Sequence, residues 1–82
     1  MNALGNDVLK VMENSSLGRM SIYVLAKQSM DLGIDMNELA PQDIPKIAAR
    51  LKTVLPFFLG DETDNIITQI RKLTNNGKGM IT

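Results

Sequence analysis

Apolar residues recur three or four positions apart along almost the whole chain of 82 residues, and this spacing constrains the fold more than any other feature. Side chains three and four residues apart lie on one face of an α-helix, whereas a half-buried strand needs strict alternation. Such alternation is absent from the sequence, and so are the paired turn residues of β-hairpins. We therefore expect an all-α protein, a single compact bundle of four to five short helices.

The clearest helical pattern starts near Ile44 and reaches the only two phenylalanines of the chain. Pro56 lies near its end and cannot donate a backbone hydrogen bond, so it either kinks or ends this helix. If the helix continues, Phe58 joins the core and Phe57 points outward, towards the side of Lys46 and Arg50. If Pro56 redirects the chain, Phe57 turns under a neighbouring helix. The expected apolar face consists of Ile44, Ile47, Ala48, Leu51, Val54, Leu55 and Phe58.

Three further segments have helical spacing, and a shorter one has the residues of a turn. We expect helices over residues 6–14, 17–32 and 61–73, and a single turn over residues 35–39. Gly33 follows the second helix, where a left-handed C-terminal cap favours glycine. The apolar residues of this helix (Leu17, Ile22, Val24, Leu25, Ala26 and Leu32) cover about half of its circumference. An arc this wide predicts that it is the central helix of the bundle.

The length and the composition indicate one small folded domain. The chain is 44% hydrophobic and 22% charged, which is typical of a globular protein rather than a disordered one. We expect a helical bundle over residues 1–73. Residues 74–82, TNNGKGMIT, lack apolar periodicity and are expected to form a flexible, disordered tail. A bundle this small buries a modest share of its surface, and many such chains dimerise.

The residue types that are missing argue against an enzyme. Histidine, the commonest general base and metal ligand, does not occur, and neither does cysteine. We therefore predict no catalytic residues, no bound metal and no cofactor. The N-terminal sequence lacks the basic and apolar regions of a signal peptide, and no apolar run is long enough for a membrane span. These features predict a cytoplasmic protein that does not enter a membrane.

Three carboxylates, Asp61, Glu62 and Asp64, follow Gly60 directly. Clustered carboxylates can hold Mg²⁺ or Ca²⁺, but their spacing does not match a calcium-binding loop. The start of a helix explains them better. Asp61 would cap the fifth helix, and Glu62 and Asp64 would lie in its first turn, where the helix dipole favours negative charge.

The expected function is a protein–protein interaction or regulatory module without catalytic activity. An apolar patch that includes Phe57 and Tyr23 would bind either another protein or a second copy of the chain as a homodimer, because exposed aromatic residues are enriched in interface cores. Lys46 and Arg50 would flank this patch.

The alternative is a small helical DNA- or RNA-binding protein that uses Lys46, Arg50 and Lys52, or Arg71 and Lys72. Nine basic and nine acidic residues give a formal net charge of zero, which argues against binding that depends on phosphate contacts. A helix-turn-helix with its turn at Gly33 would have an acidic recognition helix interrupted by Pro41.

Overall fold

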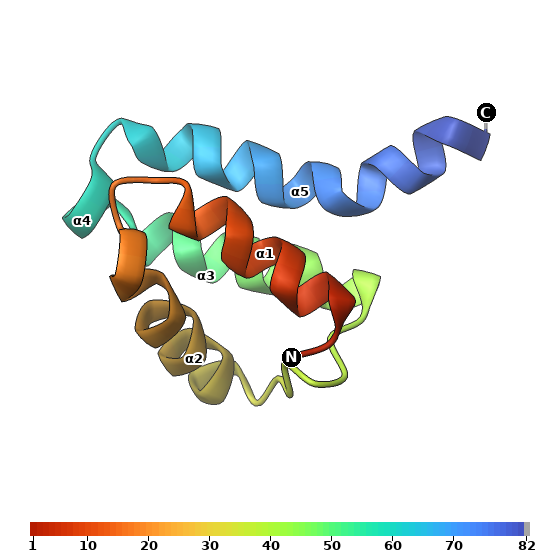
Figure 1. Ribbon diagram of the computed structural model, residues 1–82, viewed down its shortest axis with the longest axis horizontal. Coiled ribbons are helices and arrows are strands. Elements are labelled where there is room, and N and C mark those ends of the chain that lie inside the picture. Colours follow the sequence, from red (N-terminus) through yellow and green to blue (C-terminus); the bar gives the residue numbers. More distant parts are fainter. Residues whose placement is uncertain (82) are drawn as a thin grey trace.

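The computed structural model describes the backbone of residues 1–81 and the side chains of residues 1–74 (Figure 1). Short 3₁₀ helices, Gly18–Met20 and Pro41–Asp43, precede the second and third α-helices. The described residues form no strand, so the predicted all-α bundle is confirmed. Its five α-helices are α1 (Ala3–Glu13), α2 (Ser21–Leu32), α3 (Ile44–Val54), α4 (Pro56–Leu59) and α5 (Glu62–Ile81).

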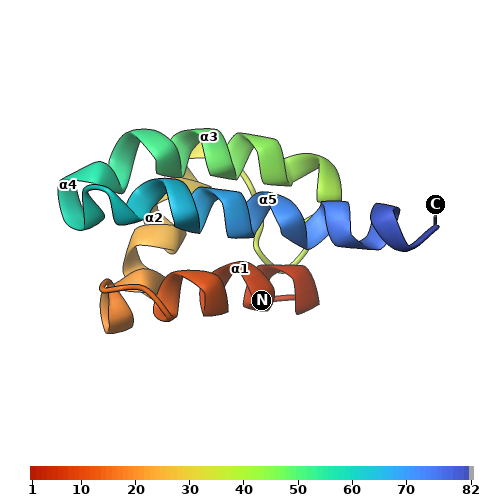
Figure 2. The ribbon, with the colours of Figure 1, turned by 90° about the horizontal axis from the view of Figure 1, so that it is seen from above.

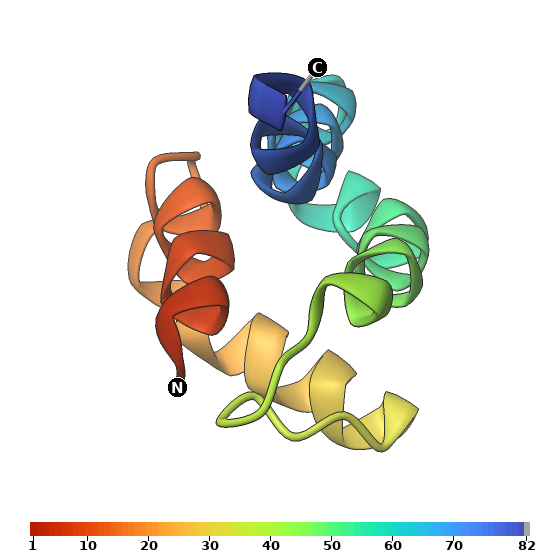
Figure 3. The same ribbon diagram turned by 90° about the vertical axis from the view of Figure 1, so that its right-hand side faces the viewer.

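Three helices run lengthwise and one crosses beneath them. In Figure 2, α1, α5 and α3 lie roughly parallel to the long axis of the molecule. In Figure 3, which looks along that axis, these three helices surround a common interior and α2 passes below it. The short α4 lies at one end of the bundle, between α3 and the start of α5 (Figure 1).

Every long helix contributes to one hydrophobic core. The largest fully buried side chains include Met12 of α1, Leu25 of α2, Leu51 of α3 and Ile70 of α5. The predicted stripe on the fifth helix is confirmed, because Ile66, Ile67 and Ile70 are buried and Leu73 packs against the core. Among residues 1–74, the buried apolar side chains are Val8, Met12, Leu17, Val24, Leu25, Leu39, Ile44, Ile47, Ala48, Leu51, Leu55, Ile66, Ile67 and Ile70.

The first helix starts earlier than its apolar spacing predicts. Asn2 is its N-cap, and the Asn2 Oδ1 atom accepts a hydrogen bond from the backbone N–H of Gly5 at 2.9 Å. The amide Nδ2 of Asn2 also donates to the carbonyl of Leu39 at 2.9 Å, and the Asn2 backbone N–H donates to the carbonyl of Met36. These long-range contacts stabilise an additional turn before Asn6, which the sequence pattern does not reveal.

The prediction that the second helix is central is wrong. α2 lies at the lower edge of the bundle in Figures 1 and 3. Its exposed side carries Ile22 and Ala26, which were expected in the core, and its buried side includes the polar Ser21, Gln28 and Ser29. Its predicted end is confirmed, because Gly33 adopts the left-handed conformation with φ 71° and ψ 28°.

The chain continues in a helical course through the residues around Pro56. Leu55 keeps helical dihedral angles between α3 and α4, and the break comes only at Gly60, with φ 55° and ψ −124°. α5 then begins at Glu62. α5 continues to Ile81, beyond the end predicted at residue 73. Apart from Thr74, the side chains of the predicted flexible tail, residues 74–82, lie outside the described residues, and the flexibility of this tail stays a prediction.

Candidate functional site

The most exposed large apolar side chain among the described residues is Phe57, with 88% of its surface accessible. Its neighbour Phe58 is 53% accessible. The placement of Phe57 outside the core agrees with a helix that continues through Pro56. The expected burial of Phe58 is wrong, because α4 lies at the end of the bundle, where Leu55 and Leu59 occupy the inward positions instead.

The backbone that carries the two phenylalanines is held by hydrogen bonds at both ends of α4. The carbonyl of Leu55 accepts from the backbone N–H groups of Phe58 at 2.8 Å and Leu59 at 2.7 Å. The N–H of Gly60 donates to the carbonyl of Pro56 at 3.1 Å. Leu59 packs against the core. The aromatic pair is therefore presented on an ordered turn and not on a loose loop.

The acidic residues predicted after Gly60 lie at the start of α5. Glu62 and Asp64 occupy its first turn, as predicted. The Asp61 side chain makes no hydrogen bond to any described residue, so its predicted role as a capping acceptor is not realised. The Glu62 Oε2 atom accepts from the backbone N–H of Ser16 at 3.4 Å, which ties α5 to the loop after α1. Among the described residues, no group of three carboxylates is placed to hold a metal ion.

A second apolar surface lies on α2 and is separate from α4 in the fold. Tyr23 is 69% accessible and Met30 is 78% accessible, and seven residues separate them, which is about two helical turns. Met20 and Ile22 are also exposed. Of these four exposed residues, the sequence predicted only Tyr23 at a partner-binding surface. Met20 and Met30, three and seven positions from Tyr23, are at helical spacing from it and carried the same signal.

The two basic residues predicted beside Phe57 have different surroundings. Lys46 is exposed on α3. Arg50 is half-buried, its Nη1 atom donates to Gln28 Oε1 at 3.3 Å, and the same atom lies 3.8 Å from the Asp31 carboxylate. Asp31 also pairs with Lys27 at 3.1 Å. Arg50 therefore joins α3 to α2, and it is not a freely exposed cation for a phosphate.

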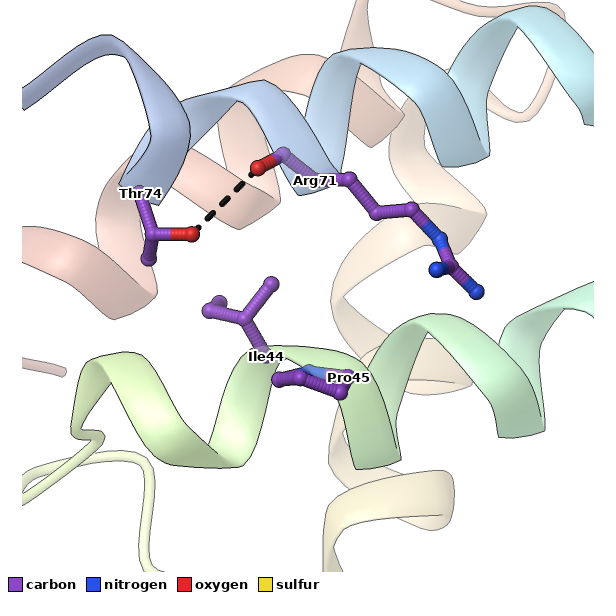
Figure 4. Close-up of a pocket in the computed structure, with 4 residues that line it drawn as sticks. All are labelled: Ile44, Pro45, Arg71 and Thr74. Atoms are coloured by element: carbon purple, nitrogen blue, oxygen red, sulfur yellow. Dashed lines mark hydrogen bonds between the residues drawn. The ribbon is translucent and has the colours of Figure 1, made fainter. Parts of the chain in front are cut away.

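An open hollow lies between α3 and α5. It has a volume of about 140 Å³ and is lined by Ile44, Pro45, Arg71 and Thr74 (Figure 4). The Thr74 hydroxyl donates to the carbonyl of Arg71 at 3.3 Å, and the Arg71 guanidinium extends away from Thr74. Small-molecule sites usually enclose about 300–1,000 Å³ and have several converging polar groups. This hollow has neither property.

Within the described part of the chain, none of the helices combines the length and the apolar character that crossing a bilayer requires. The arrangement offers two apolar surfaces with a defined backbone: the aromatic pair of α4 (Phe57 and Phe58) and the outer face of α2. No protein-family model, curated protein or solved structure matches the chain.

Proposed function

We propose that this protein is a non-catalytic interaction module that binds a partner protein through the aromatic pair of α4. The observation that carries the proposal is the 88% exposure of Phe57 on an ordered helical turn, beside the half-exposed Phe58. Aromatic residues bury large areas on binding and are enriched among the residues that dominate binding energy. Two adjacent phenylalanines at the surface are well suited to this role.

The ordered backbone of α4 supports the proposal. Binding costs free energy when flexible side chains and loops become fixed, and this cost falls when the binding residues are already held in place. Hydrogen bonds from the helical turn and the packing of Leu59 hold α4 before any partner arrives. A phenylalanine side chain also has only two rotatable bonds, so its own loss of freedom is small.

The charges near α4 indicate the chemistry of the partner. Asp61 and Asp64 are exposed directly after Gly60. A pocket that is apolar in its centre and bordered by Lys or Arg side chains would complement both the phenylalanines and these carboxylates. We therefore propose a partner protein with an apolar pocket and a basic rim.

The alternative of DNA or RNA binding has less support. The Arg50 guanidinium already forms a hydrogen bond with Gln28 and an ion pair with Asp31. The formal net charge of the chain is zero. The other predicted cations, Lys46 and Lys52 on α3 and Arg71 and Lys72 on α5, are exposed. Nucleic-acid binding through them would lose about 10³-fold or more in affinity between 50 and 200 mM salt if six or more phosphates were contacted.

Site-specific cross-linking tests this function. A photo-reactive phenylalanine analogue is placed at position 57 in cells of the native host, with the same analogue at the exposed Lys10 of α1 as the matched control. We expect one protein to be cross-linked from position 57 and not from position 10. With that protein purified, Phe57→Ala should weaken binding by roughly 30-fold or more, as truncation of a dominant interface residue does.

The salt dependence separates the two functions. Binding through the aromatic pair should change only a few-fold between 50 and 200 mM salt. A cross-link to nucleic acid, or no adduct specific to position 57, would refute the proposed function. Equal affinity of the wild type and the Phe57→Ala variant for the cross-linked protein would refute it as well.

A further inference from the structure

We draw no further inference here: the strongest candidate, the exposed outer face of α2 that carries Ile22, Tyr23, Ala26 and Met30, lies at the edge of the bundle (Figure 1), and nothing in the structure shows what covers it.

Discussion

Arg50 donates a hydrogen bond from Nη1 to Oε1 of Gln28 across 3.3 Å, and this contact joins α3 to α2. Gln28 is only 8% accessible, so its side-chain oxygen depends on a partner within the protein. An unpaired buried acceptor costs free energy because it has lost its hydrogen bonds to water. Arg50 therefore has a structural role that its position on the polar side of the helix did not indicate.

Arg50→Ala should lower the free energy of unfolding by about 1–3 kcal/mol, the usual cost of leaving a buried polar atom unpaired. The partly exposed contact with Asp31 should add little, since such ion pairs contribute about 0–1 kcal/mol. Urea unfolding followed by circular dichroism measures the change. Lys46→Ala is the matched control on the same helix and should stay within about 0.5 kcal/mol of the wild type. Equal stabilities of the two variants would contradict the role of Arg50.

Phe58→Ala should lower the free energy of unfolding by about 1 kcal/mol or less, because large losses come from side chains that are buried before truncation. Phe57→Ala should have a still smaller effect. Leu55→Ala removes a fully buried side chain from the same segment and should cost about 2–5 kcal/mol. Thermal and urea unfolding of the three variants measure their losses of stability, which should be smallest for Phe57→Ala and largest for Leu55→Ala. A loss at Phe58 as large as that at Leu55 would place Phe58 in the core after all.

Thr63→Val should leave the stability unchanged or raise it. Thr63 is 3% accessible, and its hydroxyl has no hydrogen-bond partner among the described residues. Valine has nearly the same shape and does not place an unpaired hydroxyl in the interior. Thr68→Val is the control in the same helix, because the exposed Thr68 hydroxyl donates to the carbonyl of Asp64 at 2.9 Å. A clear destabilisation by Thr63→Val in urea unfolding would show that its hydroxyl is paired in solution.

Gly33→Asn and Gly60→Asn should differ in cost, although both glycines have positive φ. Gly33 has left-handed helical angles, which asparagine tolerates, so its replacement should cost only a few tenths of a kcal/mol. Gly60 has φ 55° and ψ −124°, close to the first central position of a type II′ turn, which strongly favours glycine. We expect Gly60→Asn to cost about 1–3 kcal/mol through backbone strain. Thermal unfolding of both variants measures the two costs. Equal losses of stability would contradict the expected difference between Gly33 and Gly60.

The comparison of sequence and structure is clearest at α2. Helical spacing predicted the helix and Gly33 predicted its end, because both signals depend on residues close together in the chain. The predicted rotation of the helix about its axis was wrong for Ile22 and Ala26, which are exposed. That rotation depends on contacts with other helices, including the hydrogen bond that allows Gln28 to be buried beside Arg50. A helical wheel contains no information about such a partner 22 residues away.

The sequence by itself determined the all-α class, the approximate helix boundaries and the stripes of α3 and α5, because spacing and helix-terminating residues act locally. The tertiary structure alone decided which of these apolar residues remain at the surface. Phe58 follows the buried stripe of α3 in spacing, but α4 extends to the end of the bundle, where neighbouring helices do not cover it (Figure 1). Burial depends on which elements pack against a side chain, and only the arrangement of the helices shows that Phe58 on α4 and Ile22 on α2 stay exposed.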